Sequence, residues 1–119
     1  MNILSIAGSD PSGGAGIQAD LKAIAANGGY GMCVITALTA QNTHGVSGVQ
    51  AISGDFVLAQ LEAISADIRI DAIKIGMLAN AEVIRAVTGW LDTVDAPVVL
   101  DPVMVATSGD RLLDGEAAL

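Results

Sequence analysis

The sequence predicts an α/β fold in which a mostly parallel sheet lies between layers of helices. Three observations lead to this prediction. Apolar runs without polar alternation, as at 32–40, are typical of strands that are buried on both faces. Segments between these runs place apolar residues at the period of a helix. The two kinds of segment alternate along the chain, which favours parallel strands joined by right-handed crossovers.

The composition of the chain bounds its class. The 119 residues are enough for one small domain, and with 52% hydrophobic but only 3% aromatic residues we expect an aliphatic core. The formal net charge is −8, and no basic cluster is present, so nucleic acid and anionic membranes are not expected as partners. A nucleotide ligand would need a metal cation beside so acidic a protein.

Cysteine use and hydropathy indicate the compartment. Cys33 is the only cysteine, which excludes a disulfide within the chain and fits a reducing compartment. The sequence opens without a charged leader, and no apolar run is long enough to span a bilayer. We therefore expect a soluble, cytoplasmic protein.

The first expected strand, at 3–7, runs into a glycine-rich stretch at 8–16 and then into a helix at 16–27, which Gly28 and Gly29 end. This order of elements directs free backbone N–H groups and the positive end of the helix dipole at whatever lies in the turn. We therefore predict that an anion or a polar ligand binds there.

Four interpretations of this turn remain open. A nucleotide phosphate loop would need lysine where Gly14 stands. A dinucleotide fold matches the pattern at 14–19, but no acidic residue between Asp20 and Asp55 is present to hold a ribose. The turn can also be the glycine wall of a small-molecule pocket, into which Asp20 looks from the helix. The fourth interpretation is a tight turn whose glycines only allow close packing.

A second strand is expected at 32–40, and it ends abruptly in polar residues at 41–45. Ligands of open α/β sheets bind outside the carboxyl ends of strands, which puts Gln41 beside the glycine turn. Its amide has a donor and an acceptor, which suits the edge of a heterocycle, although a strand-end glutamine can equally bond to backbone. A short extended segment is expected at 46–52.

The second half of the chain continues the alternation. A helix is expected from about Asp55, a strand at 72–78 and a last strand at 97–100 that ends at Asp101. Asn80 can cap the helix between these two strands. The inner face of that helix is expected to carry Val83, Ile84, Val87 and Leu91, with Trp90 at its margin.

Besides Gln41, four residues are candidates for chemistry, each with a structural alternative. Asp101 follows a strand end, where a carboxylate can hold Mg²⁺ near phosphates or can cap the following turn. Asp20 lies one helical turn after the glycine stretch, and this spacing alone favours a solvated side chain. Lys74 lies between two isoleucines and needs either a carboxylate or a route to solvent. Met77 can line a pocket or simply pack.

Four stretches of the chain, at 6–22, 36–43, 73–78 and 99–104, form a combination that is far more specific than any lone glycine pattern. In this order they resemble the hydroxymethylpyrimidine/phosphomethylpyrimidine kinases of the ribokinase-like superfamily. The resemblance implies a ribokinase-like three-layer fold with a mostly parallel sheet, of which residues 1–119 would be the N-terminal half. Residues 114–119 look like the start of a helix, so we expect a domain truncated after Leu119.

The resemblance implies an activity and a site. The reaction would be ATP- and Mg²⁺-dependent phosphorylation of 4-amino-5-hydroxymethyl-2-methylpyrimidine and of its monophosphate, in thiamine biosynthesis. Gln41 would bind the aminopyrimidine edge, Asp20 would lie near the polar groups of the substrate, and Asp101 would lie near the metal and phosphates. The ring pocket would be lined by Gly8, Met77 and Val103.

The same resemblance implies what the chain lacks. The second half of the family's domain carries the catalytic base and most of the ATP site, so the 119 residues alone are expected to be inactive. The glycine stretch would be mainly a substrate wall, which accounts for its missing lysine. Many relatives carry lysine where Thr107 stands, and we assign no phosphate-binding role to that position.

Three other functions remain open at this point. A pyridoxal kinase of the same superfamily would phosphorylate a similar hydroxymethyl heterocycle. A pyrimidine-binding module without catalysis would bind the ligand at any length of chain, and a dinucleotide oxidoreductase would bind NAD. The family resemblance also suggests a homodimer, although the residues themselves indicate no interface.

Overall fold

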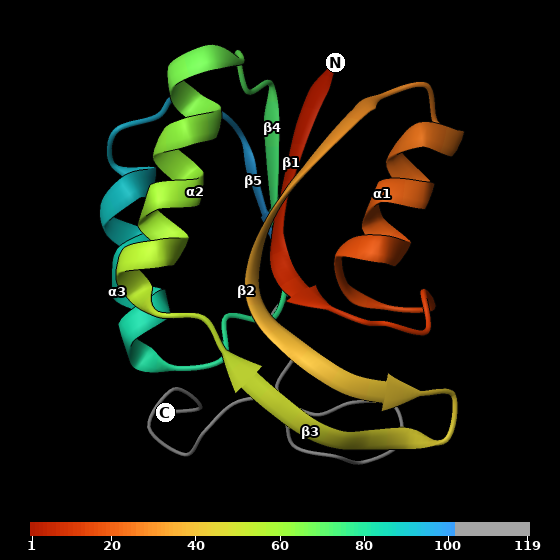
Figure 1. Cartoon of the computed structure of the whole chain (residues 1–119). Helices are drawn as coiled ribbons and strands as arrows, with labels where there is room; N and C mark the ends of the chain where they lie inside the picture. The colour runs from red at the N-terminus through yellow and green to blue at the C-terminus, as the bar shows by residue number, and fades with distance from the viewer. Residues whose placement is uncertain (102–119) are drawn as a thin grey trace.

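The computed structural model describes residues 1–101, and these form one five-stranded sheet with helices on both faces (Figure 1). The strand order is β3-β2-β1-β4-β5, and only β3 runs antiparallel to its neighbour. The strands are β1 (Asn2–Ser9), β2 (Tyr30–Asn42), β3 (Gly45–Ala51), β4 (Ala72–Ile75) and β5 (Val98–Leu100). The predicted α/β class with a mostly parallel sheet is confirmed.

The three helices divide into two layers. Helix α1 (Gly16–Ala26) packs on β1 and β2 from one face, while α2 (Gly54–Asp67) and α3 (Ala81–Leu91) cover the other face together (Figure 1). Ser53 and Asn80 cap α2 and α3, because each side-chain oxygen accepts a hydrogen bond from the backbone N–H three residues on, at 3.2 Å and 3.0 Å. The predicted cap at Asn80 is confirmed.

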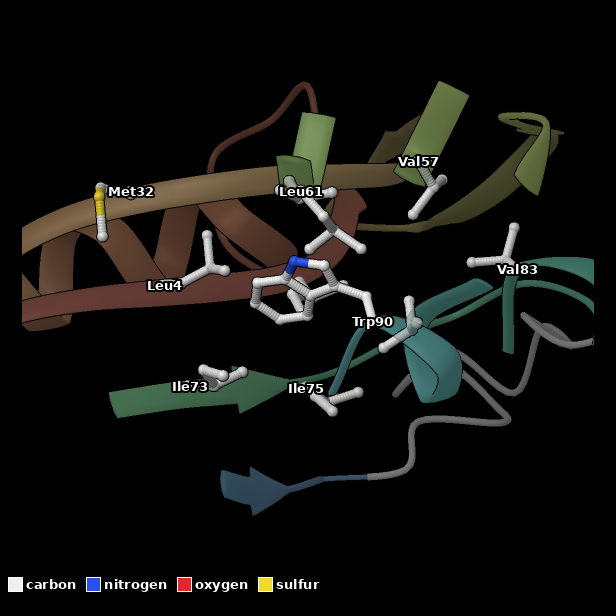
Figure 2. Packing of buried hydrophobic residues seen from close by; sticks show 11 residues of the cluster. Leu4, Met32, Val57, Leu61, Ile73, Ile75, Val83 and Trp90 are labelled. Atoms are coloured by element: carbon white, nitrogen blue, oxygen red, sulfur yellow. The ribbon is translucent and has the colours of Figure 1, made fainter. Parts of the chain in front are cut away.

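The core lies between the sheet and the α2–α3 layer. It is almost wholly aliphatic, as the composition predicts, and burying each such side chain contributes about 1.5–3 kcal/mol. Figure 2 shows the exception, Trp90, whose indole ring lies among the aliphatic side chains. The buried cluster is Leu4, Ile6, Met32, Val34, Val57, Leu61, Ile73, Ile75, Val83, Val87 and Trp90.

Trp90 corrects one prediction. It was expected at the margin of α3, yet its side chain is only 4% exposed, whereas Ile84 and Leu91 of the expected inner face are half-buried. The reason is that α3 lies against α2 as well as the sheet, and the indole ring fills the space between these elements, with its Nε1 atom 3.5 Å from the Ser65 hydroxyl of α2.

Strand β2 also differs from its prediction. It continues to Asn42, and its second half is not buried on both faces, since Leu38 is 45% exposed. This half pairs with β3 through an antiparallel hairpin instead of lying between helix layers. The Asn42 side chain closes the hairpin by accepting hydrogen bonds from the backbone N–H groups of His44 and Gly45.

Candidate functional site

The carboxyl ends of the parallel strands β1, β4 and β5 lie at one edge of the sheet, where β2 extends into its hairpin with β3 (Figure 1). The turn from β1 to α1 lies at this edge, and so do Met77 and Asp101, which follow β4 and β5. The topology therefore gathers at this edge most of the residues that the sequence singles out. Of the predicted site residues, Val103 lies outside the described residues. The expected start of a helix at 114–119 also lies outside them.

Asp10 is the centre of the turn between β1 and α1. Its carboxylate is 3% exposed and accepts four hydrogen bonds. The backbone N–H and the hydroxyl of Ser12 donate to Oδ1 at 2.8 Å and 2.7 Å. The backbone N–H groups of Gly14 and Ala15 donate to Oδ2 at 3.0 Å and 2.8 Å. Ala15 is the N-cap residue of α1 and has no capping side chain of its own, so Asp10 binds the backbone immediately before the helix.

The electrostatics of the turn follow from this arrangement. Burial by itself would raise the pKa of the Asp10 carboxyl, but the hydrogen bonds from Ser12, Gly14 and Ala15 outweigh burial and hold that pKa below its usual value. The carboxylate is thus ionised at neutral pH and offsets the positive end of the α1 dipole. The turn holds an anion, and this anion belongs to the chain itself.

The prediction that the turn offers free N–H groups to a ligand is therefore wrong for Ser12, Gly14 and Ala15. The sequence contains a signal for this outcome, since an Asp two residues before a Ser in a glycine-rich stretch is typical of a side-chain-closed turn. The turn also fails as a nucleotide phosphate loop for a reason beyond its missing lysine, because a phosphate would meet the Asp10 charge.

Gln18, which the sequence interpretation did not single out, ties the turn to α1. Its Oε1 accepts the backbone N–H of Asp10 at 2.8 Å, and its Nε2 donates to the Ser9 hydroxyl at 2.8 Å. The end of β1 is held in this way from the first turn of the helix. No motif in the sequence distinguishes Gln18 from an ordinary helix-surface glutamine.

Gly8 and Met77, two predicted wall residues, lie in contact. A Cβ atom on Gly8 would be 2.2 Å from the Met77 Cε atom, so the absent side chain of Gly8 leaves the space that the methionine fills. Met77 is 6% exposed and its carbonyl oxygen accepts a hydrogen bond from the buried Thr36 hydroxyl. Strands β1, β2 and β4 together therefore fix the position of this methionine.

Gln41 lies inside β2, and not beyond the end of a strand as the sequence predicted, because β2 pairs with β3 up to Asn42. It is nevertheless connected to the end of β1. The Thr39 hydroxyl lies 2.8 Å from the Ser9 carbonyl oxygen and 3.0 Å from Gln41 Oε1. Gln41 also lines a hollow of about 410 Å³ on the hairpin, together with His44.

Asp20 is paired within the protein, whereas its spacing favoured a solvated side chain; 21% of its side chain is exposed. Its Oδ2 atom accepts a hydrogen bond from the Ser5 hydroxyl at 2.7 Å and forms an ion pair with Lys74 Nζ at 2.9 Å. Asp20 is thus the carboxylate that pairs with the Lys74 ammonium, which the apolar residues of β4 cannot do. Asp20 reaches β1 at Ser5, three residues before Gly8, so it lies farther back along the strand than the Gly8–Met77 contact.

Asp101 continues the line of β5, and its backbone N–H donates to the Ile75 carbonyl oxygen at 2.8 Å. It is exposed. Within residues 1–101 no three side chains of His, Cys, Asp or Glu gather as a metal site. Within the same range no helix is both long and apolar enough to cross a membrane.

Comparison with known proteins gives a consistent result at the level of sequence. The family model of phosphomethylpyrimidine kinase matches residues 10–119. The chain is 63% identical to the thiamine biosynthesis multifunctional protein ThiED of Corynebacterium efficiens, covering 97% of this chain and 16% of that protein. It is 57% identical to the hydroxymethylpyrimidine/phosphomethylpyrimidine kinase of Escherichia coli, covering 98% of this chain and 44% of that protein.

Solved structures give the same result at the level of fold. The phosphomethylpyrimidine kinase of Clostridium difficile superposes with a TM-score of 0.89 at 50% identity, covering 98% of this chain and 51% of that one. The pyridoxal kinase of Staphylococcus aureus in complex with AMP-PCP superposes with a TM-score of 0.76 at 40% identity, covering 89% and 39%. The chain thus spans about half or less of the length of these relatives.

Proposed function

Because the chain belongs to the phosphomethylpyrimidine kinase family, we propose that the full-length protein phosphorylates 4-amino-5-hydroxymethyl-2-methylpyrimidine and then its monophosphate, with ATP as the phosphoryl donor. This places it in the synthesis of thiamine diphosphate. The observation that carries the proposal is the 57% identity to a kinase named for both substrates, which extends over 98% of the chain. Residues 1–119 are then the N-terminal part of a single ribokinase-like kinase domain.

The geometry of the site supports substrate binding by this part of the domain. Gly8 and Met77 lie in contact at the end of β1 and offer an apolar wall for a flat ring, which Val103 would extend. Gln41 would donate to and accept from the aminopyrimidine edge, because its amide carries both kinds of group. The Thr39 hydroxyl, beside Gln41 Oε1, would help to orient that amide.

The phosphoryl donor needs a cation beside so acidic a protein. Magnesium in kinases is held by one or two carboxylates together with substrate phosphates, and Asp101 at the end of β5 is the described carboxylate best placed to contribute one. Bound Mg²⁺ would neutralise phosphate charge. Asp10 cannot serve this purpose, because all of its hydrogen-bonding capacity faces the turn. We expect the 119 residues alone to be inactive, since phosphoryl transfer needs the remaining site residues in place.

The test is incubation of the full-length protein with Mg-ATP and each of three candidate acceptors: the hydroxymethylpyrimidine, its monophosphate and pyridoxal. The release of ADP and the mass of the product measure the phosphorylation. We expect the pyrimidine to gain one and then a second phosphoryl group, with pyridoxal a poorer substrate. Preferred phosphorylation of pyridoxal would favour the second candidate, which the likeness to pyridoxal kinase supports. Binding of the pyrimidine without ADP release would reduce the protein to a binding module.

A matched pair of variants tests the site. Gln41→Leu removes the amide that we assign to the pyrimidine edge, and Gln50→Leu makes the same change at an exposed position of the same hairpin. Loss of such hydrogen bonds costs about 1–3 kcal/mol, so the KM for the pyrimidine should rise at least about fivefold in Gln41→Leu. Equal KM values in the two variants would remove Gln41 from the site.

Two further proposals concern the state of the protein. We place the reaction in the cytoplasm, where the lone Cys33 would stay reduced. Partial burial raises the pKa of its thiol, which suits an unreactive cysteine. A homodimer stays a prediction. Sedimentation equilibrium of the full-length protein decides it, because a monomer at micromolar concentration would contradict the prediction.

A further inference from the structure

One polar cluster on the sheet is used neither by the core nor by the turn. It joins Ser5 of β1, Lys74 of β4 and Asp20 of α1, three residues that are distant from one another in the sequence. Ser5 is fully buried, while the side chains of Lys74 and Asp20 are 26% and 21% exposed. This partly exposed ion pair gives Lys74 the carboxylate that an ammonium in an apolar strand needs, and it also holds the Asp20 side chain in place.

The register of the sheet explains how the three groups meet. Ser5 and Lys74 are direct partners in the parallel pairing of β1 with β4. The residues on either side of Lys74, Ile73 and Ile75, belong to the core beneath α2 and α3, so Lys74 points to the opposite face. The Asp20 side chain of α1 lies on that face and accepts hydrogen bonds from both Ser5 and Lys74.

The two donors converge on one oxygen of the carboxylate. The Ser5 hydroxyl is 2.7 Å and the Lys74 ammonium 2.9 Å from Asp20 Oδ2, and no described residue donates to Oδ1. Charge-assisted bonds of this length restrict the orientation of the group that accepts them. Asp20 therefore presents its second oxygen in a defined direction, as an acceptor without a partner in residues 1–101.

The cluster is also connected to the proposed ring wall of Gly8 and Met77. The Lys74 ammonium lies only 3.1 Å from the position that a Cβ atom on Gly76 would take, so the missing side chain of Gly76 makes room for it. Gly76 immediately precedes Met77, the wall residue in contact with Gly8, and its backbone N–H is bonded to the Ile6 carbonyl oxygen at 2.8 Å. Lys74 near the end of β4 and Met77 just after it are thus joined through the short segment 74–77.

We propose that Lys74, together with Ser5, is a positioning residue that holds the Asp20 carboxylate with its free oxygen toward a hydrogen-bond donor of the phosphoryl acceptor. An ionised carboxylate only accepts hydrogen bonds, so the group it takes is a hydroxyl or an amino group of the substrate. This inference rests on the proposed kinase function. The new element is that binding of the phosphoryl acceptor depends on Lys74, which does not contact that acceptor.

Variants of the full-length protein at Lys74, Asp20 and a control position test the proposal. Lys74→Met keeps the length of the side chain and removes its charge, and Lys74→Arg restores a cation that can pair with Asp20. The control is Arg69→Met, which removes a different ion pair, from Arg69 to Asp71 at 3.2 Å, whose arginine is 88% exposed. For each protein the KM and kcat of pyrimidine phosphorylation and the thermal midpoint are measured.

We expect Lys74→Met to raise the KM for the pyrimidine about tenfold, because it loses the charged hydrogen bond that orients Asp20. Lys74→Arg should stay within about threefold of the wild type, and Arg69→Met should be unchanged. Lys74→Met and Asp20→Asn should not add in the double variant, since both break the same contact. A Lys74→Met enzyme with a lower thermal midpoint but a wild-type KM would overturn the proposal and leave Lys74 a structural residue.

Failure of the proposed function gives a different pattern. In that case the wild type releases no ADP with the pyrimidine, and calorimetric binding of the pyrimidine to the wild type and to Lys74→Met replaces the kinetics. Weaker binding to Lys74→Met than to the wild type and Arg69→Met would support the role of Lys74 in a binding protein. Equal binding, or no binding by any of the three, would overturn it.

Discussion

The carbonyl oxygen of Gly8 occupies the space that a side chain on Gly16 would need. A Cβ atom on Gly16 would lie 2.3 Å from that oxygen, and Gly16 has a φ of +57°, in the left-handed region. The end of β1 and the start of α1 thus approach each other through backbone alone. An isolated bridge between Ser9 and Gly16 marks the same approach.

Gly16→Ala should therefore destabilise the protein strongly. The left-handed conformation costs a non-glycine residue about 1–2 kcal/mol, and backbone must also move to relieve the overlap, so we expect a loss above about 3 kcal/mol. Gly28→Ala is the control for φ alone, because its φ is +82° and no atom lies within 4 Å of the new Cβ. A thermal midpoint as high in Gly16→Ala as in Gly28→Ala would contradict the close approach.

At a third glycine, substitution by alanine should raise the stability of the protein instead of lowering it. Gly89 lies inside α3, and nothing lies within 4 Å of a Cβ built on it. Alanine there reduces the entropy lost on folding, so Gly89→Ala should raise the stability by about 0.5–1 kcal/mol. Thermal unfolding of the full-length variant measures this, and a lowered midpoint would show that α3 has a neighbour at this position.

Asp10→Asn should destabilise the turn, because the amide nitrogen of asparagine would face N–H donors. We expect a loss of about 1–3 kcal/mol near neutral pH. Asp55→Asn makes the same change in the exposed first turn of α2 and should cost at most about 1 kcal/mol. The thermal midpoints of the two full-length variants provide the comparison, and equal losses would mean that the Asp10 bonds contribute nothing beyond a helix dipole.

The contribution of Asp10 should depend on pH in one direction. Its pKa in the folded protein is below the value of about 3.9 that an unfolded aspartate has, so its stabilisation is complete above that value and is lost as the pH falls through the folded pKa. The difference in midpoint between the wild type and Asp10→Asn should therefore shrink in acid. A carboxyl carbon NMR titration should place the Asp10 midpoint below 3.9, and a higher midpoint would refute the assignment.

Gly8→Ala should affect substrate binding more than folding. The new methyl group would overlap only the flexible end of Met77, which can swing away at a cost of about 1 kcal/mol. The displaced methionine then changes the proposed ring wall, so the KM for the pyrimidine should rise several-fold. Gly8→Ala combined with Met77→Leu removes the overlapping atom and should restore part of the affinity. An unchanged KM in Gly8→Ala would exclude this wall from the site.

Trp90→Ala should be among the most destabilising changes in the described part of the chain. The indole is 4% exposed at the centre of the cluster in Figure 2, and truncating a buried Trp costs about 3–5 kcal/mol. Phe56→Ala removes an aromatic side chain of α2 that is 59% exposed, and it should cost less than about 1 kcal/mol. Similar thermal midpoints for these two variants would mean that Trp90 is not part of the core.

The order and type of the elements could be read from the sequence, because each depends on local patterns. The glycine stretch at 8–16, the cap at Asn80 and the helical spacing after Asp55 all lie in short windows whose chemistry is local. The run at 32–40 was correctly predicted as a strand. Its burial was not, because exposure of Leu38 depends on where the helices of distant segments happen to end.

The partners of the polar side chains were decided by the tertiary structure. The sequence shows Asp20 as a helix residue and Lys74 as a charge in an apolar strand, but only the pairing of β1 with β4 brings them to 2.9 Å. Asp10 is different, because the partners of its carboxylate lie within five residues and its turn was in principle readable from the sequence. Local periodicity determines which backbone forms, whereas the register between strands distant in sequence determines which charges meet.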